Sequence, residues 1–367
     1  MHVDWPALLP EPTSAYPKYQ SLLDIVSKWS PDDPELPPRF TETLMHFNYS
    51  DPVERGYAEK FRDAEVPFKV YGVPEFNTVA GLWTDDYLQK NLVGKEQHVE
   101  KSDTNHFMYW TPRGKPDPEY EPPTKFITMS FEEWLGIAKA ADASKQRNDT
   151  VHYYFMTSSP PRDNKKSFVS RDLTPFSTET NNFFITNVPA NKGIQCRFGM
   201  RGIIAEAHFD SGRNMVAMLK GAKRYILNPP SACKQLGIIS DTKHPSYRHS
   251  VIDWSDIQQA ESRGFAKVQG IDTVVRMGEV LYIPSYWLHY IISTRYSIQC
   301  NSRSGAPPSG RGQPDIEECF GPDFTYVCLD HRICCFVRYV PHMPCCVPLV
   351  SPYRKFSKKK RLRQKQG

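Results

Sequence analysis

The chain has 367 residues, enough for one large domain or two ordinary ones with a proper hydrophobic core. Its formal net charge is +5, but eight of the 46 Lys and Arg lie between Arg354 and Lys365, which leaves 38 basic against 41 acidic residues elsewhere. This balance argues against nucleic acid as the main partner, although the basic tail can serve as a nucleic-acid contact or a nuclear address. Neither a secretory signal peptide nor a membrane span is predicted.

Cysteine usage changes along the chain. The first three hundred residues hold only Cys196, Cys233 and Cys300, whereas six cysteines cluster towards the end, namely Cys319, Cys328, Cys334, Cys335, Cys345 and Cys346. We therefore expect no disulfide framework in the body of the chain, and a reducing compartment, cytoplasmic or nuclear. The sequences at Asn48 and Asn148 match the N-glycosylation pattern, which leaves open that an ancestor of this chain passed through the secretory pathway.

Residues 1–150 are expected to form a helical and irregular region that packs on the following domain. Apolar periodicity around Leu22, Leu23 and Val26 predicts a first helix, and residues 84–92 predict another. The sequence Ser130-Phe-Glu-Glu133 matches a capping box, in which a serine side chain begins a helix, so a third helix is predicted there.

From residue 151 the sequence changes to short runs rich in Val, Ile, Tyr and Phe, which are typical of strands. Eight such runs indicate a mostly β fold with some α, a double-stranded β-helix of the jelly-roll or cupin type over residues 151–305. The runs are Val151 to Met156, Ile194 to Met200, Glu206 to Phe209, Met215 to Leu219, Lys223 to Leu227, Val280 to Ile283, Leu288 to Ile292 and Tyr296 to Cys300. Residues 306–367 are expected to be a poorly ordered tail, first Cys-rich and then basic.

A candidate metal site begins with His208-Phe-Asp210. Residues two apart in a strand project to the same face, so this imidazole and this carboxylate can meet one ion. His289, just after the apolar run Val280 to Pro284, can complete a set of two histidines and one carboxylate. Such a set leaves metal positions open, as iron(II) oxygenases require, whereas structural zinc prefers a closed shell. The similar His2-Val-Asp4 has no predicted strand around it and is set aside.

Lys223 follows thirteen residues after Asp210 on a neighbouring predicted strand. Its ammonium group can meet a distal carboxylate as a point charge. Strand alternation puts Lys223 and Tyr225 on one face and Arg224 on the other, but an outward-facing lysine stays the alternative.

Several motifs in order make residues 196–305 resemble the JmjC and cupin-like hydroxylases, among them the asparaginyl hydroxylases. The matching stretches are Gly199-Met-Arg-Gly202, His208-Phe-Asp210 with Asn214, Lys220-Gly-Ala-Lys-Arg224, Asp272-Thr-Val-Val275, Gly278-Glu-Val-Leu-Tyr-Ile-Pro284 and Tyr286-Trp-Leu-His289.

The resemblance implies a role for each matching residue. His208, Asp210 and His289 look like iron(II) ligands and Lys223 like the partner of 2-oxoglutarate. Three further residues look like co-substrate contacts or polar helpers, namely Tyr154 (with Tyr153 as the other registration), Asn214 and Asn301.

One position departs from the family. Where the family often has Thr or Ser three residues before the first histidine, this chain has Ala205. Loss of that hydrogen bond weakens co-substrate binding by about 1.5–3 kcal/mol, unless Tyr154 or Tyr225 compensates.

The resemblance further implies an Fe(II)- and 2-oxoglutarate-dependent dioxygenase. It would use O2 to hydroxylate a protein or peptide side chain such as Asn, Asp or His, and release succinate and CO2. Two alternatives stay open, a JmjC-type N-methyl-lysine demethylase and a non-catalytic cupin binding module. A metal-dependent cupin isomerase or sugar enzyme would not need Lys223. The oligomeric state stays open.

Overall fold

The computed structural model describes most of the chain, and all described residues belong to one compact unit. They are residues 16–40, 42–94, 97–112, 119–145, 150–161, 163, 165–305 and 312–321. Of the tail predicted over 306–367, residues 312–321 are described. The rest of that tail and the Asn148 sequon lie outside the described residues.

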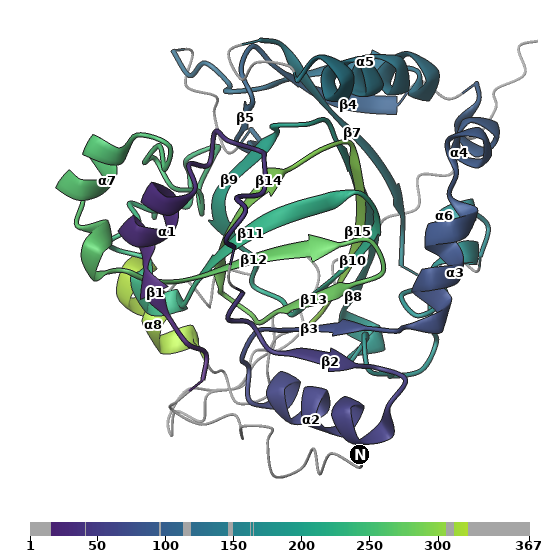
Figure 1. The fold of residues 1–367 in the computed structure, drawn as a ribbon, viewed down its shortest axis with the longest axis horizontal. Helices are drawn as coiled ribbons and strands as arrows, with labels where there is room; N and C mark the ends of the chain where they lie inside the picture. The colour runs from purple at the N-terminus through teal and green to yellow at the C-terminus, as the bar shows by residue number, and fades with distance from the viewer. Residues whose placement is uncertain are drawn as a thin grey trace, which may run out of the picture. The chain divides into compact units, whose positions relative to one another are not determined.

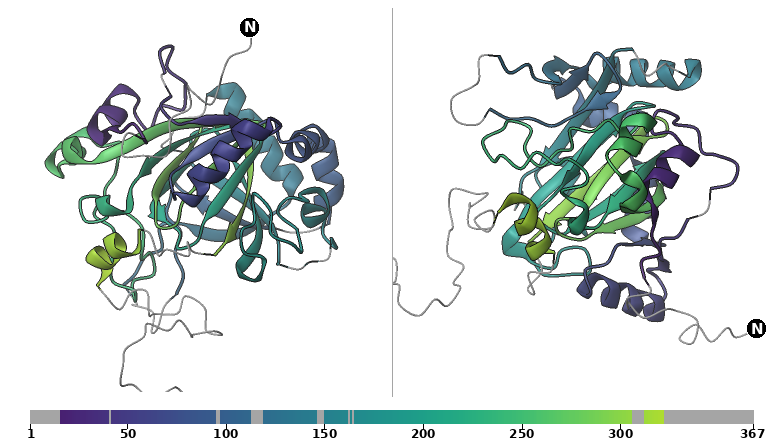
Figure 2. Two further views of the ribbon diagram at one scale, coloured as in Figure 1. Left: turned by 90° about the horizontal axis from the view of Figure 1, so that it is seen from below. Right: turned by 90° about the vertical axis from the view of Figure 1, so that its left-hand side faces the viewer.

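Two facing β-sheets form the framework (Figures 1 and 2). The six-stranded sheet runs in the order β1 (Gln20–Ser21), β12 (Gln269–Arg276), β11 (Ala222–Asn228), β14 (Leu288–Ser293), β9 (Ile204–Phe209) and β5 (His106–Phe107). The nine-stranded sheet runs in the order β2 (His46–Asn48), β3 (Phe68–Tyr71), β13 (Val280–Ile283), β10 (Asn214–Lys220), β15 (Ser297–Ser304), β8 (Asn191–Gly199), β7 (His152–Ser159), β4 (Gln97–Ser102) and β6 (Lys125–Met129). This jelly-roll arrangement with added helices confirms the predicted fold class.

Helices cover the outside of these sheets. They are α1 (Leu22–Lys28), α2 (Pro52–Asp63), α3 (Pro74–Leu82), α4 (Asp85–Leu92), α5 (Phe131–Ser144), α6 (Phe168–Asp172), α7 (Ile257–Ser262) and α8 (Gln313–Phe320). Figures 1 and 2 show α5 and α2 at opposite ends of the described unit. Strands such as β10 and β13 are therefore buried along nearly their whole length, which explains their continuous apolar sequences.

Helix α5 shows how a local signal and tertiary packing combine. The Ser130 side chain accepts a hydrogen bond from the Glu133 amide, as the capping motif predicts. On the buried face, Trp134 packs against Phe155 of β7 and Phe198 of β8. The helix therefore begins at a residue that the sequence specifies and is held by contacts to the main sheet.

The region before residue 151 is more than helical and irregular. Six short strands, β1 to β6, come from it and extend both sheets at their edges. β2 and β6 pair with β3 and β4 of the same region, whereas the other four have partners further along the chain, as in the pairing of Gln20 with Gly270. Two- to six-residue strands carry little periodicity of their own, so this part of the prediction was incomplete. The strand β12 was also not among the eight predicted runs.

A buried arginine of the barrel, Arg224, ties the N-terminal region to the barrel strands. Arg224 is fully buried and binds Asp272 on the neighbouring strand, at 2.7 and 2.8 Å. Its guanidinium also donates to the backbone carbonyls of Ile25 and Trp29, at the end of α1. The first helix is thus part of the same core as the barrel.

Two disulfides contradict the expectation that the body of the chain lacks them. Cys196 and Cys300 are register partners on β8 and β15, with a Cα–Cα distance of 4.1 Å. Cys233 is joined to Cys319 of α8. Pairing across 104 residues depends on strand register, which cysteine spacing does not reveal. Disulfides are typical of oxidising compartments, so the argument for a reducing one loses its basis, and a cytoplasmic or nuclear location stays a prediction.

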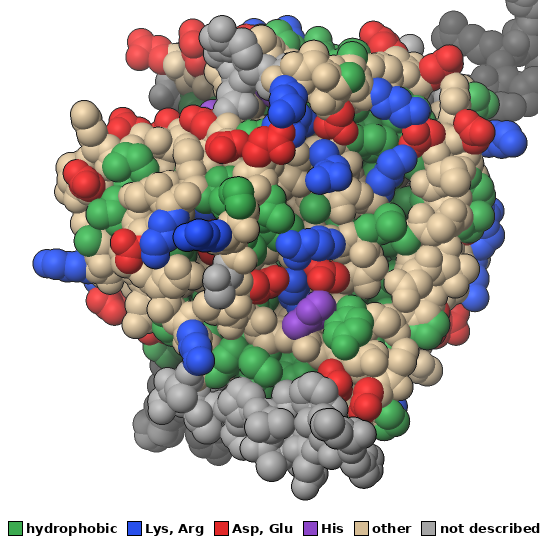
Figure 3. Space-filling view, in the orientation of Figure 1, with side chains coloured by type: hydrophobic (Ala, Val, Ile, Leu, Met, Phe, Trp, Pro, Cys, Tyr) green, Lys and Arg blue, Asp and Glu red, His purple; other side chains and the backbone are tan. Residues whose placement is uncertain are grey.

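The surface carries no single-sign charge field on the face that Figure 3 shows, where basic and acidic side chains are interspersed. Among the helices of the described ranges, none has the length and apolar character to cross a bilayer.

Candidate metal centre

Strand β9 presents the first two predicted ligands to the barrel interior. His208 pairs with His289 of β14, whereas Ala205 pairs with Ile291. Between these two pairs, Glu206 and Ala207 of β9 lie opposite Tyr290 alone, which is a β-bulge. Because of the bulge, Ala205 and His208 both line the internal cavity although they are three residues apart.

The three predicted ligands converge. One ligand atom from each of His208, Asp210 and His289 lies within 4.8 Å of the other two, and the two imidazole centroids are 4.2 Å apart. Within the described part of the chain, this is the one group of His, Cys, Asp or Glu side chains with metal-site geometry. Strand alternation predicted that His208 and Asp210 share a face, and the structure adds His289, the third candidate from the sequence, to the same group.

Hydrogen bonds orient both histidines. The Nδ1 atom of His208 lies 2.7 Å from the Glu206 carbonyl oxygen, and that of His289 lies 3.0 Å from the Trp287 carbonyl oxygen. A carbonyl only accepts, so each Nδ1 carries the hydrogen and each Nε2 keeps a free lone pair. This is the arrangement that metal-bound histidines generally show.

Charge and burial keep the three groups in their ligand forms. Burial, together with the neighbouring histidines His289 and His249, holds the pKa of His208 well below its usual value. Burial likewise lowers the pKa of His289. For Asp210, burial alone would raise the pKa, but Arg303 and the nearby histidines lower it overall. At neutral pH the imidazoles are therefore neutral and the carboxylate is ionised.

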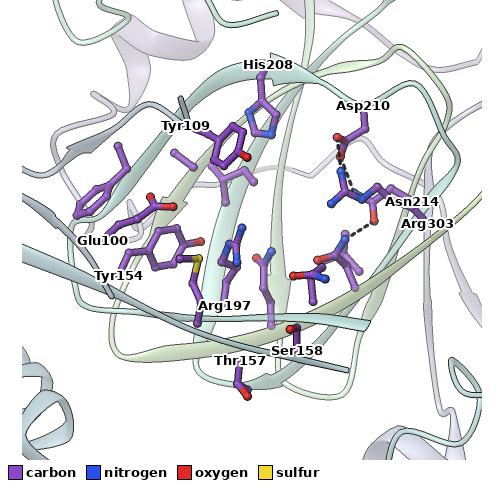
Figure 4. A pocket seen from close by; sticks show the side chains of 18 of the residues that line it. Glu100, Tyr109, Tyr154, Thr157, Ser158, Arg197, His208, Asp210, Asn214 and Arg303 are labelled. Carbon is purple, nitrogen blue, oxygen red and sulfur yellow. Dashed lines mark hydrogen bonds and ion pairs between the residues drawn. The ribbon is translucent and has the colours of Figure 1, made fainter. Parts of the chain in front are cut away.

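Asp210 is fixed from several sides (Figure 4). Arg303 donates to its Oδ1 at 2.5 Å, and Arg248 lies 3.8 Å from the same atom. The Asp210 backbone carbonyl accepts from the amide of Tyr286, whose φ of 67° is in the left-handed region. A non-glycine residue in that region stores strain, so the turn before β14 is held in place by the surrounding structure.

The two predicted amide helpers form a chain that ends on Asp210. Asn301 donates to Asn214 Oδ1 at 2.9 Å, and Asn214 donates to Asp210 Oδ2 at 3.4 Å. All three side chains are buried. The amides therefore contact the carboxylate ligand directly or through one link.

Two imidazoles and one carboxylate suit a ferrous ion with open coordination positions. Nitrogen and oxygen donors of this kind, grouped on one face, are the ligand set of non-haem iron(II) oxygenases. No described Cys, Asp or Glu joins the group as a fourth ligand, so it lacks the closed shell of structural zinc. The residues present therefore fit the iron that the sequence implies.

Lys223 and Tyr154 also meet. The Lys223 Nζ donates to the Tyr154 hydroxyl at 2.9 Å, and both side chains are buried. Burial, and then Arg197, holds the pKa of Lys223 well below its usual value. Tyr154, and not Tyr153, lines the cavity, which favours the first of the two registrations. Lys223 itself lies behind Tyr154.

The cavity beside the three ligands has a volume of about 730 Å³. Ala205 lines it, so the family's hydroxyl is missing at that point, and the Tyr225 hydroxyl is bound to Gln299 at 2.5 Å. Tyr109 and Phe126 lie on its wall and are 47% and 45% exposed, which indicates that the cavity opens to solvent beside them.

Sequence reasoning missed several charged residues and one histidine of this cavity, namely Glu100, Arg197, Arg248, His249 and Arg303. Arg303 lies two residues after Asn301 on β15, so alternation could have found it. The His249 ring stacks on that of His208 at 5.0 Å, but it comes from the irregular segment between β11 and β12, where no pattern pointed to it.

Comparison with known proteins agrees with this site. The sequence profile of the cupin-like domain matches residues 55–302, more than half of the chain, and the chain therefore belongs to the cupin-like domain family. This confirms the family-level resemblance, while a closer relation to asparaginyl hydroxylases stays a prediction. The chain is also similar to the lysine-specific demethylase JMJ30 of Arabidopsis thaliana, at 30% identity over 101 residues. That match covers 28% of this chain and 23% of the relative, so the chain aligns with less than a quarter of its length.

Proposed function

We propose that the chain is an Fe(II)- and 2-oxoglutarate-dependent dioxygenase that hydroxylates a protein or peptide side chain. The observation that carries the proposal is the convergence of His208, Asp210 and His289 on the wall of an internal cavity. Membership of the cupin-like domain family supports it, since two imidazoles and one carboxylate are the ligands of such oxygenases.

When bound, a ferrous ion with 2-oxoglutarate supplies the oxidising power to insert one oxygen atom of O2 into a C–H bond, with succinate and CO2 as co-products. The chain contributes the binding groups. His208 and His289 offer their Nε2 lone pairs, and Asp210 offers a carboxylate that Arg303 keeps ionised. Lys223 binds the Tyr154 hydroxyl, and Tyr154 lines the cavity, where it can meet the distal carboxylate of the co-substrate.

The cavity is large enough for a substrate side chain beside the co-substrate. Its volume of about 730 Å³ lies within the range found for sites that bind drug-sized ligands. Such ligands are larger than 2-oxoglutarate, a five-carbon dicarboxylate. The exposed rings of Tyr109 and Phe126 offer an apolar contact at the opening. We infer that a side chain of a peptide enters there.

Anaerobic calorimetry with Fe(II) and 2-oxoglutarate, followed by succinate measurement in air, tests the proposal. The wild-type chain should bind both and form succinate, and a peptide library should gain the mass of one oxygen. Asp210→Asn, which keeps the shape but removes the charge, should bind the metal much more weakly. A wild-type chain that binds neither would instead support the non-catalytic cupin module.

N-methyl-lysine demethylation is the second candidate. Two observations favour it, the similarity over 101 residues to a protein named as a lysine-specific demethylase, and Glu100 on the cavity wall with Phe126 opposite it in register. A carboxylate beside aromatic rings can hold a cationic side chain. Hydroxylation of an N-methyl group releases formaldehyde, so formaldehyde from methyl-lysine peptides would favour this candidate over stable hydroxylation.

A further inference from the structure

Arg197 is a cation that faces the cavity without a partner. It lies on β8, in register with Met156 of β7 on one side and Gln299 of β15 on the other, and all three line the cavity. Its guanidinium makes no hydrogen bond or ion pair with the residues that the structure describes. Figure 4 shows it extending into the cavity beside Tyr154.

The other cations of the cavity are already engaged. Arg303 and Arg248 both approach Asp210, and Arg248 also donates to the Phe209 carbonyl. Lys223 is bound to the Tyr154 hydroxyl and does not itself line the cavity. Among the described residues of the wall, Arg197 is therefore the cationic group left to meet an incoming anion.

The surroundings of Arg197 suit a carboxylate. Tyr154 precedes Met156 by two residues on β7 and so faces the same side, and the Gln299 amide lies on the opposite flank. Glu100 pairs in register with Tyr154 and senses the charge of Arg197, but the two described side chains form no ion pair. The charge of Arg197 also affects its neighbours. It lowers the pKa of Lys223, and it partly offsets the rise in pKa that burial causes in Tyr154 and Glu100.

We propose that Arg197 binds the distal carboxylate of the 2-oxoglutarate co-substrate, together with the Tyr154 hydroxyl that Lys223 supports. A guanidinium presents a rigid fork of donors that matches a carboxylate, and such charge-assisted pairs are strong. The pair would supply the donor that is missing at Ala205. This inference rests on the proposed function and names the residue that selects a dicarboxylate over a monocarboxylate.

Calorimetry with the full chain and Mn(II), which replaces Fe(II) without turnover in air, tests this assignment. The probes are 2-oxoglutarate and 2-oxopentanoate, which has a methyl group in place of the distal carboxylate. Arg197→Met should weaken the binding of 2-oxoglutarate on the order of 10- to 100-fold and leave the binding of 2-oxopentanoate nearly unchanged. Arg197→Lys should restore part of the loss. Lys192→Met, an exposed change of equal charge on the same strand, should match the wild type.

The outcomes separate this inference from the proposed function. If the wild type binds neither Mn(II) nor 2-oxoglutarate, the proposed function fails and this inference with it. If the wild type prefers 2-oxoglutarate and Arg197→Met keeps that preference, only the assignment of Arg197 is wrong. An equal loss of affinity for both ligands would mean that Arg197 has a structural role. If Arg197→Met does not fold, the ratio of the affinities for 2-oxoglutarate and 2-oxopentanoate in Arg197→Lys decides the assignment.

Discussion

Asp210 illustrates how neighbouring groups prepare a single side chain for its role. Its carboxylate is buried, which on its own would favour the protonated form, yet Arg303 and the nearby histidines keep it charged. Asn214 and Asn301 add a hydrogen-bonded chain on the other side. The ligand is therefore oriented before any ion arrives, and the orientation depends on residues from β10 and β15.

We expect Asn214→Ala to lower the affinity for Fe(II) about 10- to 100-fold, because groups that orient a ligand contribute at this level. Asn301→Ala removes only the second link of the chain and should have a smaller effect. Anaerobic titration with Fe(II) measures both. Equal affinity in Asn214→Ala and the wild type would show that Asp210 does not need the amide.

His152, which is not one of the candidate metal ligands, should make the free energy of unfolding depend on pH. It is fully buried, and burial holds its pKa below the usual value. In the unfolded chain the pKa is about 6.5, so below that pH the unfolded state takes up a proton that the folded state resists. The free energy of unfolding should therefore fall as the pH is lowered from 7.5 to 5.5.

The variant His152→Phe keeps a ring at this position and removes the titration. Urea unfolding at the two pH values, in EDTA, should show a smaller loss of stability on acidification in the variant than in the wild type. The same loss in both proteins would assign the pH dependence to other groups.

Among the elements, α5 depends most clearly on a local signal. The Ser130 hydroxyl caps the helix, and removal of such a cap costs about 1 kcal/mol. We expect Ser130→Ala to lower the free energy of unfolding by that amount in urea denaturation. Ser144→Ala, the same change at the exposed last residue of the helix, should be nearly neutral. Similar effects at both ends would contradict the capping role.

The bulge in β9 shows the opposite case, in which an element is shaped by its partner. Strict alternation from His208 would turn Ala205 away from the cavity, yet both residues line it. The extra residue between them is accommodated only because β14 pairs on both sides of it. A pattern within β9 alone does not reveal this change of direction.

For the molecule as a whole, the N-terminal region and the barrel are one structure. The ammonium group of Lys69, which is fully buried on β3, contacts Glu42 at 2.8 Å, Glu279 at 3.2 Å and the Val274 carbonyl at 2.9 Å. These partners come from parts of the chain more than two hundred residues apart. Removal of the lysine would leave two carboxylates close together without their shared cation.

We therefore expect Lys69→Met to lower the free energy of unfolding by about 3–5 kcal/mol, because breaking a buried ion pair leaves a buried charge without its partner. Lys125→Met on the exposed face of β6 is the matched control and should change stability by less than about 0.5 kcal/mol. Urea unfolding followed by tryptophan fluorescence measures both. A small effect of Lys69→Met would indicate that the N-terminal region is joined to the barrel mainly by apolar packing.

Features that arise from local pattern could be predicted from the amino-acid sequence. Strand periodicity predicted most of the barrel strands, and the spacing of His208 and Asp210 put both groups on one face. His289 and Lys223 were candidates from their places in the predicted strands, and the family resemblance added Tyr154; all three lie at the same cavity or directly behind it.

Contacts between residues that are distant in the sequence became known from the fold. Strand order and register explain the pairing of Cys196 with Cys300 and the approach of Arg303 to Asp210. They also explain why the Arg197 guanidinium faces the cavity. Local preferences act over a few residues, whereas register is set by the packing of entire sheets. For this reason the sequence indicated the metal ligands, and the fold added the charged groups around them.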